Sequence, residues 1–371
     1  MKTPAIAAFF LATGLLLSAC RKDDDNDPAT PPDEDWPSDS IRVLRSNLNF
    51  PWEILWGKDD HIWMTERAGK VSKINPETGA TVFSHTITDV VSNGEGGLLG
   101  MVQHPDFSSN GYLYVVYNYN SPSGYREKVV RFTAQNNTLT APFTLIDSIP
   151  AAGIHNGSRL LIAGDKLFIT TGDANASARS QNTSVVNGKV LRLNLDGTVP
   201  ADNPIAGNPY WSLGHRNAQG LVMVNNKLYA SEHGAGVEDE LNIIEKGRNY
   251  GWPRVEGPCN GSETSFCSEN NVKGPIWSTG NVTLATCGLD YYNNDRIPAW
   301  KNSLLLTTLK DATLYRFALS ADGNSVSAPQ KYFDGTWGRL RDICVSPAGR
   351  VYLCTSNGNN GDKLVEISRL D

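Results

Sequence analysis

The sequence predicts an all-β protein built as a six-bladed β-propeller. A polar turn followed by alternating apolar residues recurs six times in the 371-residue chain, at starts roughly 50 to 75 residues apart. One propeller blade needs about 40 to 50 residues. Period-two alternation with many β-branched and aromatic residues between Gly, Asn and Asp turns is typical of strands. After residue 37 the sequence shows no convincing amphipathic-helix pattern.

The repeats predict the strands in chain order. The recurring strands start at His61, Tyr112, Lys166, Lys227, Ser303 and Arg350. Second strands follow after a short turn, starting at Gly69, Glu127, Gly188, Ala312 and Lys363. A further strand at residues 41–48 precedes the first repeat, and we expect it to complete the last blade and close the ring. An open β-sandwich array is the alternative, but six strand pairs of blade length favour radial repetition, which also hides sheet edges.

The N-terminus predicts a lipoprotein signal peptide over residues 1–20. Lys2 supplies the positive start, residues 5–17 form an apolar run too short to span a bilayer, and Leu-Ser-Ala-Cys ends at Cys20. This ending resembles a bacterial lipobox, in which the cysteine receives the lipid. The alternative is an ordinary secretory signal. We expect an exported bacterial lipoprotein, anchored to the outer membrane only through its lipid and either periplasmic or surface-exposed.

Residues 21–37 are expected to form an acidic, proline-containing, disordered tether, and residues 38–371 the propeller catalytic domain. The tether carries two basic and seven acidic side chains. Most of the net charge of −6 therefore lies there, and residues 36–371 carry only −2. A nearly neutral domain lacks the electrostatic basis for binding nucleic acid.

Five cysteines follow Cys20, and an exported protein can keep disulfides. Cys259 and Cys267 flank a short loop that a disulfide could close. Cys344 and Cys354 lie on either side of a turn, and Cys287 is either free or paired with one of them. The sequence alone leaves the connectivity open.

A propeller gathers loops from different blades at one end of its channel. The loop at residues 152–159 contains His155, a side chain that can act as a general base near neutral pH. A single loop histidine is more often just solvated. Asp173, which follows the next strand, could accept a hydrogen bond from the imidazole and fix its tautomer, so the pair favours a base with an orienting carboxylate.

Two further loops combine polar residues with glycine. Residues 213–220 place Arg216 and Asn217 in one turn, which could also be a hydrogen-bonded corner. Residues 231–242 combine glycines, which expose carbonyl oxygens, with several carboxylates. Hard cations such as calcium prefer oxygen ligands, although a solvated acidic loop would look the same.

A fourth group of residues is basic. Lys310 follows the strand that starts at Ser303, and Arg339 and Arg341 are two residues apart, so that on one strand they would share a face. On the channel face they would form a clamp for carboxylates, whereas at the surface they would pair with neighbouring aspartates. Together with the histidine and the glycine-rich loop, this group favours an anionic, metal-bound cofactor.

From about Asn47 to the C-terminus, the chain resembles the soluble glucose and aldose sugar dehydrogenases that depend on pyrroloquinoline quinone (PQQ), within the glucose/sorbosone dehydrogenase family. The resemblance rests on five ordered segments, at residues 94–100, 104–107, 188–194, 214–217 and 249–253. They read GEGGLLG, HPDF, GKVLRLN, GHRN and NYGWP. Each segment alone would be weak, but five in order over nearly the whole domain are specific.

The resemblance implies PQQ and calcium as cofactors and a role for each matching residue. It implies His155 as the general base, Asp173 as its orienting partner, and Arg216 with Asn217 as contacts near the reactive quinone carbonyl. The residues implied to hold the remaining oxygens of the cofactor are Thr283, Lys310, Arg339 and Arg341. The implied calcium ligands are the backbone carbonyls of Gly234 and Ala235, with Asp239 in support.

The implied reaction oxidises an aldose at its anomeric carbon to the lactone. Hydride passes to the quinone while His155 removes the hydroxyl proton, and the electrons then leave to an external acceptor. A propeller that has become a carbohydrate- or protein-binding module is one alternative, but it has no need for the whole set of matching residues. A calcium-dependent lactonase is another, but it leaves the cationic clamp unexplained.

Four positions depart from the family. Ala235 stands where proline is frequent, and Glu95 stands where sugar dehydrogenases commonly have glutamine. Ile154 and His233 replace more polar or amide residues. Because Glu95 would bring a carboxylate to the substrate, these departures bear on the choice of sugar more than on the cofactor.

Overall fold

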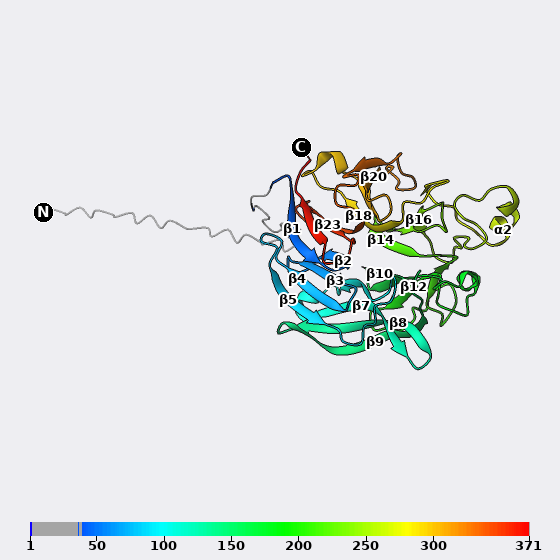
Figure 1. The fold of residues 1–371 in the computed structure, drawn as a ribbon, viewed down its shortest axis with the longest axis horizontal. Coiled ribbons are helices and arrows are strands. Elements are labelled where there is room, and N and C mark those ends of the chain that lie inside the picture. The colour runs from blue at the N-terminus through cyan, green and yellow to red at the C-terminus, as the bar shows by residue number, and fades with distance from the viewer. Residues whose placement is uncertain (2–35, 37–38, 371) are drawn as a thin grey trace.

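The computed structural model of the chain is a six-bladed β-propeller, which confirms the predicted fold (Figure 1). It describes residues 1, 36 and 39–370. The predicted signal peptide, the lipidation site Cys20 and the predicted tether lie outside these residues, apart from Met1 and Trp36. No helix in the described ranges is both long and apolar enough to cross a membrane.

Six antiparallel sheets of four strands each form the blades. The first blade contains β2 (Pro51–Trp56), β3 (Ile62–Glu66), β4 (Lys70–Ile74) and β5 (Thr81–Thr86), and the second contains β6 (Leu98–Gln103), β7 (Tyr112–Ser121), β8 (Gly124–Gln135) and β9 (Thr138–Pro150). The third blade contains β10 (Gly157–Ala163), β11 (Lys166–Thr171), β12 (Lys189–Asn194) and β13 (Tyr210–Leu213), and the fourth contains β14 (Ala218–Val224), β15 (Lys227–Glu232), β16 (Glu240–Ile244) and β17 (Trp277–Ser278). The fifth blade contains β18 (Thr286–Tyr292), β19 (Ser303–Thr308), β20 (Leu314–Ala318) and β21 (Gln330–Tyr332), and the sixth contains β22 (Leu340–Val345), β23 (Val351–Thr355) and β24 (Asp362–Ile367) together with β1 (Ile41–Leu48). The short helices are α1 (Phe107–Asn110), α2 (Thr264–Glu269) and the 3₁₀ turns η1 (Ser177–Gln181), η2 (Gly261–Glu263) and η3 (Pro298–Trp300).

The first strand of each blade lies at the centre of the molecule. Strands β2, β6, β10, β14, β18 and β22 contact one another in a closed ring. The ring closes at the sixth blade, where the N-terminal β1 pairs with the C-terminal β24, as the sequence predicted. Figure 1 shows this seam, with β1 in blue beside β23 in red.

The hydrophobic core lies between neighbouring blades. Trp63 and Val71 of the first blade pack with Leu98 and Val115 of the second. The strands that recur in the sequence are the second strands of the blades, namely β3, β7, β11, β15, β19 and β23. They are rich in apolar residues because they lie inside the blades, and all six residues of β19, for example, are buried. Burial of this apolar area between blades holds the ring together.

Every first strand has a register shift near its start. The shifts fall between residues 51 and 54, 98 and 101, 157 and 160, 218 and 220, 286 and 289, and 340 and 342. A β-bulge of this kind breaks the strict alternation of side chains and turns an additional residue toward one face. The six bulges lie at the same end of the channel, where the first strands begin.

The five cysteines within residues 39–370 form one disulfide and three free thiols. Cys259 and Cys267 form the disulfide that the sequence left open, with an S–S distance of 2.01 Å. Cys287, Cys344 and Cys354 are free and buried. Cys344 is paired across the strands with Tyr352 and Cys354 with Asp342, so the two cysteines are not opposite each other and the possible pairing across the turn is wrong.

Candidate active site

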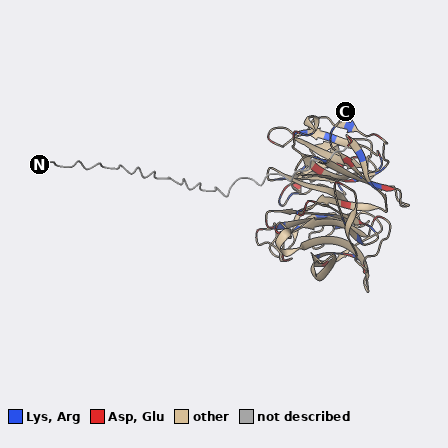
Figure 2. Cartoon of the chain, turned by 90° about the vertical axis from the view of Figure 1, so that its left-hand side faces the viewer, with Lys and Arg blue, Asp and Glu red and all other residues tan. Residues whose placement is uncertain are grey.

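The end of the channel where the first strands begin, which is also where the second strands end, gathers polar side chains from five blades. We call this region the mouth. Its charged and imidazole groups are Arg67, Glu95, His155, Asp173, Arg216, His233, Arg339 and Arg341, which lie near enough to influence one another's ionisation or to share hydrogen bonds. Figure 2 shows that acidic and basic residues are otherwise interspersed along the blades.

His155 and Asp173 are held together as the sequence predicted. The Nδ1 atom of His155 lies 3.0 Å from Oδ1 of Asp173. The indole Nε1 of Trp252 donates to the other carboxylate oxygen at 2.9 Å. Asp173 is 2 % exposed, whereas the imidazole is 16 % exposed. Since a carboxylate accepts at Nδ1, the proton of the neutral ring resides there and Nε2 is left as the basic atom.

The backbone around the histidine is equally constrained. His155 adopts a left-handed φ of 56°, a conformation that is uncommon outside glycine. Its carbonyl accepts from the N–H of Ala174 at 3.0 Å, and its own N–H donates to the Glu95 carboxylate at 3.1 Å. Glu95, predicted as a substrate residue, is therefore also a contact that fixes the histidine loop. The loop that carries Glu95 packs tightly against the histidine loop, because a Cβ atom on Gly94 would lie 2.1 Å from the carbonyl oxygen of Gly153.

The segment at residues 214–217 is organised from below by a buried carboxylate. Glu232 accepts from Nδ1 of His215 at 2.8 Å and from the backbone N–H groups of Arg216 and Asn217. His215 is fully buried and stacks on Tyr250 with ring centroids 4.7 Å apart. The motif histidine is thus structural, and the sequence did not identify Glu232 as the residue that holds the turn.

Arg216 and His233 face each other across this turn. Arg216 lies over the Trp252 ring at 5.4 Å and donates to the His233 carbonyl at 3.4 Å. Asn217 accepts at its side-chain oxygen from the N–H of Gly157 at 3.0 Å. Burial, together with the cations of Arg341 and Arg216, lowers the pKa of His233 well below its usual range, while Glu95 opposes this shift. The His233 imidazole is therefore neutral at physiological pH.

The strongest electrostatic feature of the mouth is an excess of arginine. Arg341 is 6 % exposed and forms no ion pair with any residue that the structure describes. Desolvation of their guanidinium groups and the charge of the nearby Arg341 lower the pKa of both Arg67 and Arg339. The Nε atoms of Arg67, Arg216 and Arg341 are buried and lack a hydrogen-bond partner within the described chain. Buried cations without counter-ions are unfavourable unless an anion joins them.

Asp239 connects the glycine-rich loop to the start of the next blade. Its carboxylate accepts from the N–H of Gly234 at 2.9 Å, from the Thr283 hydroxyl at 3.0 Å and from the N–H of Ala285 at 2.7 Å. The carbonyl oxygens of Gly234 and Ala235 accept no hydrogen bond from any residue in the described ranges. Unused carbonyls on a tied loop fit a hard cation.

No cluster of three or more His, Cys, Asp or Glu side chains that could hold a metal occurs in residues 39–370. A cation at the mouth would therefore rely on backbone oxygens and on the ligand that accompanies it.

The structure unites some predicted site residues and separates others. Asp173 and Glu95 both hydrogen-bond to His155, and the N–H of Asp173 donates to the carbonyl of Arg216 at 2.9 Å. Asn217 follows Arg216 and accepts from the N–H of Gly157 in the histidine loop. Arg341 and Arg339 adjoin this group. Arg339 precedes β22 and is exposed, whereas Arg341 lies on the bulge and is buried, so the two do not follow simple strand alternation. Thr283 and Lys310 line a neighbouring pocket of about 630 Å³ with Trp277.

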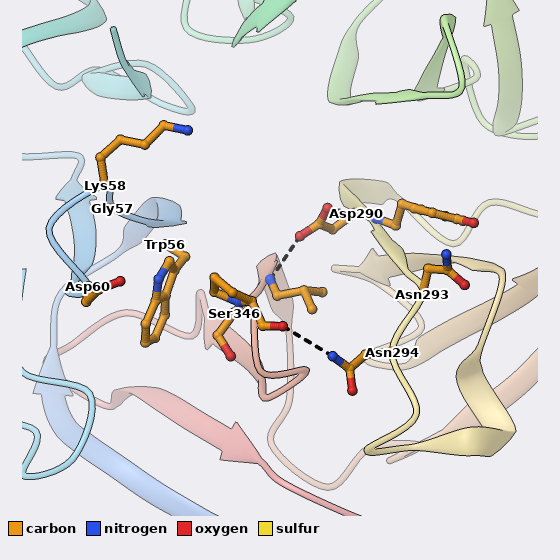
Figure 3. Close-up of a pocket in the computed structure, with 11 residues that line it drawn as sticks. Trp56, Gly57, Lys58, Asp60, Asp290, Asn293, Asn294 and Ser346 are labelled. Atoms are coloured by element: carbon orange, nitrogen blue, oxygen red, sulfur yellow. Dashed lines mark hydrogen bonds between the residues drawn. The ribbon is translucent and has the colours of Figure 1, made fainter. Parts of the chain in front are cut away.

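A second large pocket lies at the opposite end of the channel, where the first strands end (Figure 3). Trp56, Asp290 and Val345 line it, and its volume is about 570 Å³. Asp290 accepts from the Val345 N–H at 2.9 Å. None of the predicted site residues borders this pocket, so the mouth is the candidate active site.

Comparison with known proteins agrees with this geometry. The family model for Glucose / Sorbosone dehydrogenase matches residues 48–366. The chain is 31 % identical to quinoprotein glucose dehydrogenase B of Acinetobacter calcoaceticus, over 87 % of this chain and 86 % of that protein. It is 29 % identical to the aldose sugar dehydrogenase YliI of Escherichia coli, over 89 % and 92 % of the two chains.

Solved structures show the same similarity. The PQQ-bound aldose sugar dehydrogenase of Streptomyces coelicolor superposes with a TM-score of 0.77 at 30 % identity, covering 88 % of this chain and 97 % of that one. The apo form of the soluble aldose sugar dehydrogenase of Escherichia coli superposes with a TM-score of 0.79 at 27 % identity, covering 88 % and 98 %. The chain belongs to the Glucose / Sorbosone dehydrogenase family.

Proposed function

We propose that this protein oxidises an aldose sugar at its anomeric carbon to the lactone, with PQQ and calcium as cofactors. The proposal rests on Arg341, which is buried and has no described counter-ion, and which shares the mouth with Arg67, Arg216, Arg339 and the His155–Asp173 pair. This arrangement places a cationic binding site for a polyanionic cofactor next to a general base. Relatives whose names include quinoprotein glucose dehydrogenase and PQQ-bound aldose sugar dehydrogenase support the same assignment.

Different residues of the chain would bind the cofactors and transfer the proton. The arginines, with Asn217, would hold the oxygens of the quinone, and the carbonyls of Gly234 and Ala235 would hold calcium. When bound, PQQ supplies the two-electron acceptor for hydride, and calcium supplies Lewis-acid polarisation.

Proton removal belongs to His155. Its Nε2 accepts the proton of the anomeric hydroxyl, and the Asp173 carboxylate stabilises the imidazolium that forms. Trp252 keeps that carboxylate in place from the other side. Arg216 adds positive charge near the reacting oxygen, where negative charge develops. Glu95 and the neutral His233 border the same space and are available to contact the sugar hydroxyls.

The test is reconstitution of the purified protein with PQQ and calcium, followed by dye reduction with a panel of aldoses. We expect activity that needs both cofactors and that His155→Ala reduces by at least ~10³-fold, while PQQ binding, followed by absorbance, persists. Absence of any spectral change with PQQ would instead point to a binding module. Lactone hydrolysis without PQQ would point to a hydrolase.

We also propose that the protein is exported and anchored through a lipid on Cys20, which the lipobox-like segment supports. Metabolic labelling with palmitate should mark the wild-type chain but not Cys20→Ala. The variant should move from the membrane fraction to the soluble fraction, and equal membrane retention of both chains would contradict the proposal.

A further inference from the structure

Arg341 is held by two neutral side chains from two other blades. Its Nη1 donates to Oε1 of Gln219 at 2.8 Å and lies 3.0 Å from Sγ of Cys287. The Cys287 thiol in turn lies 3.3 Å from the same Gln219 oxygen. Each of the three residues falls within a β-bulge of its first strand, on β22, β14 and β18 respectively.

This trio rests on a rigid charged layer below it. Nε of Arg159 donates to the backbone carbonyl of Gln219 at 2.7 Å. Arg159 itself pairs with Glu53 at 2.6 Å and with Asp342 at 3.0 Å. The ring of Trp52 lies under both arginines, 4.4 Å from the guanidinium carbon of Arg159 and 5.8 Å from that of Arg341. Gln219 therefore cannot move independently of the channel floor.

The two arginines of this layer differ in one respect. Arg159 has two carboxylate partners, so its charge is compensated, whereas the described partners of Arg341 are an amide and a thiol. Burial raises the pKa of the Cys287 thiol, which keeps it protonated and uncharged at neutral pH. A carboxylate in place of either group would orient Arg341 equally well but would also compete with any anion for its charge.

We propose that Gln219 and Cys287 are positioning residues that orient Arg341 without neutralising it, so that its full charge is directed to a carboxylate-bearing ligand at the mouth. This inference rests on the proposed function in naming PQQ as that ligand. It predicts that the orientation of Arg341 and its uncompensated charge can be changed separately. One substitution can keep the hydrogen bond to Arg341 while neutralising its charge, and another can remove the hydrogen bond while leaving the charge uncompensated.

The test is Gln219→Glu, which preserves shape and an acceptor oxygen but adds a carboxylate beside Arg341. We expect the dissociation constant for PQQ, measured by absorbance titration in saturating calcium, to rise by at least ~10-fold. Gln219→Met, which removes the acceptor but adds no charge, should weaken binding less. The matched control is Gln103→Glu, because Gln103 is also a buried glutamine of a first strand but lies at the other end of the channel. Its PQQ affinity should match the wild type.

A probe that needs no redox chemistry separates this inference from the proposed function. Citrate, a simple tricarboxylate, should raise the melting temperature of the wild-type protein and of Gln103→Glu but not of Gln219→Glu. If the wild type fails to bind PQQ yet shows this citrate pattern, the redox assignment fails while the role of Gln219 stands. If Gln219→Glu binds both anions like the wild type, or loses no more affinity than Gln219→Met, the inference is overturned.

Cys287 provides a second route should Gln219→Glu fail to fold. Cys287→Ser keeps a small polar contact to Arg341 and should retain PQQ affinity within ~3-fold, whereas Cys287→Asp should weaken it like Gln219→Glu. Cys344→Asp is the matched control, since Cys344 is another buried free cysteine of a first strand. Equal PQQ affinities for Cys287→Asp and Cys287→Ser, in folded protein, would also overturn the inference.

Discussion

At the scale of single residues, function at the mouth depends on how completely each polar atom is partnered. Asp173 uses both carboxylate oxygens, one on His155 and one on Trp252. It also accepts from the N–H of Asn175 at 2.8 Å. All three partners donate, so this position requires a group that only accepts, which is a property of the ionised carboxylate.

Asp173→Asn tests this requirement. An asparagine can offer one oxygen but must turn its NH₂ toward either the histidine or the tryptophan, which leaves a donor facing a donor or selects the wrong tautomer of His155. We expect kcat for aldose oxidation to fall by about 10²- to 10⁴-fold with little change in PQQ affinity. Trp252→Phe, which removes only one donor, should lower kcat far less. Equal kcat values for Asp173→Asn and the wild type would contradict the orienting role.

A second residue-scale feature is the burial of Glu127, which is 1 % exposed. Burial raises its pKa to about 8, against hydrogen bonds from Ser158 and Asn118 that act to lower it. The folded protein therefore keeps a proton on Glu127 that the unfolded chain loses near its ordinary pKa. Stability from this group is fully present below that ordinary pKa and is lost as pH rises toward 8 and above.

Glu127→Gln should remove this pH dependence. In the wild type the group contributes a decline in unfolding free energy of up to ~1.4 kcal/mol per pH unit between about pH 5 and 8. The variant should therefore gain melting temperature relative to the wild type at pH 9 but not at pH 5, as measured by thermal unfolding across pH. The exposed Glu77→Gln is the control and should show no such crossover. If the melting temperatures of Glu127→Gln and the wild type instead change with pH in parallel, Glu127 is ionised in the folded protein.

At the scale of structural elements, single carboxylates tie separate loops of the mouth to one another. Glu232, at the end of β15, orders the turn that precedes β14. Asp239, just before β16, ties the loop after β15 to the start of β18. Each carboxylate is buried and accepts hydrogen bonds from backbone N–H groups of the mouth that have no backbone carbonyl as a partner.

Asp239→Asn should loosen the loop that carries the carbonyls of Gly234 and Ala235. Its NH₂ group would oppose at least one of the backbone N–H donors that now point at the carboxylate. Because a lost supporting contact typically costs 10- to 100-fold in metal affinity, we expect the calcium concentration for half-maximal activation to rise by about that factor. Asp311→Asn, on the neighbouring blade, should leave it unchanged. Unaltered calcium dependence in Asp239→Asn would place the cation elsewhere.

At the scale of the whole molecule, stability depends on closing the ring. The sixth blade combines three strands from the C-terminus with β1 from the N-terminus. Glu366 of β24 fixes this seam, because it pairs with Arg42 of β1 at 2.6 Å and with Arg350. Without β1, the edge of β24 would be exposed and the contact between the chain ends would be lost.

Deleting residues 21–49 should therefore lower the melting temperature by 10 °C or more and promote association through β24, given that several kcal/mol of strand pairing and packing are removed. Deleting residues 21–35, which spares β1 and the contacts of Trp36 with Arg350, should leave the melting temperature within ~2 °C of the full-length protein. Thermal unfolding and size-exclusion chromatography measure both effects. Equal stability of the two truncated chains would show that β1 does not close the ring.

The sequence by itself determined the architecture and the identity of most chemical groups at the mouth. Strand periodicity and the sixfold repeat are local properties, so the recurring strands, the closing role of residues 41–48 and the pairing of His155 with Asp173 could all be expected. The tertiary structure decided which cations meet. Arg341 enters the channel because a bulge interrupts β22, whereas Arg339 remains exposed and Lys310 lines a neighbouring pocket. Gln219, Cys287 and Glu232 were not identified because their partners lie 15 to 122 residues away and come together only in the folded propeller.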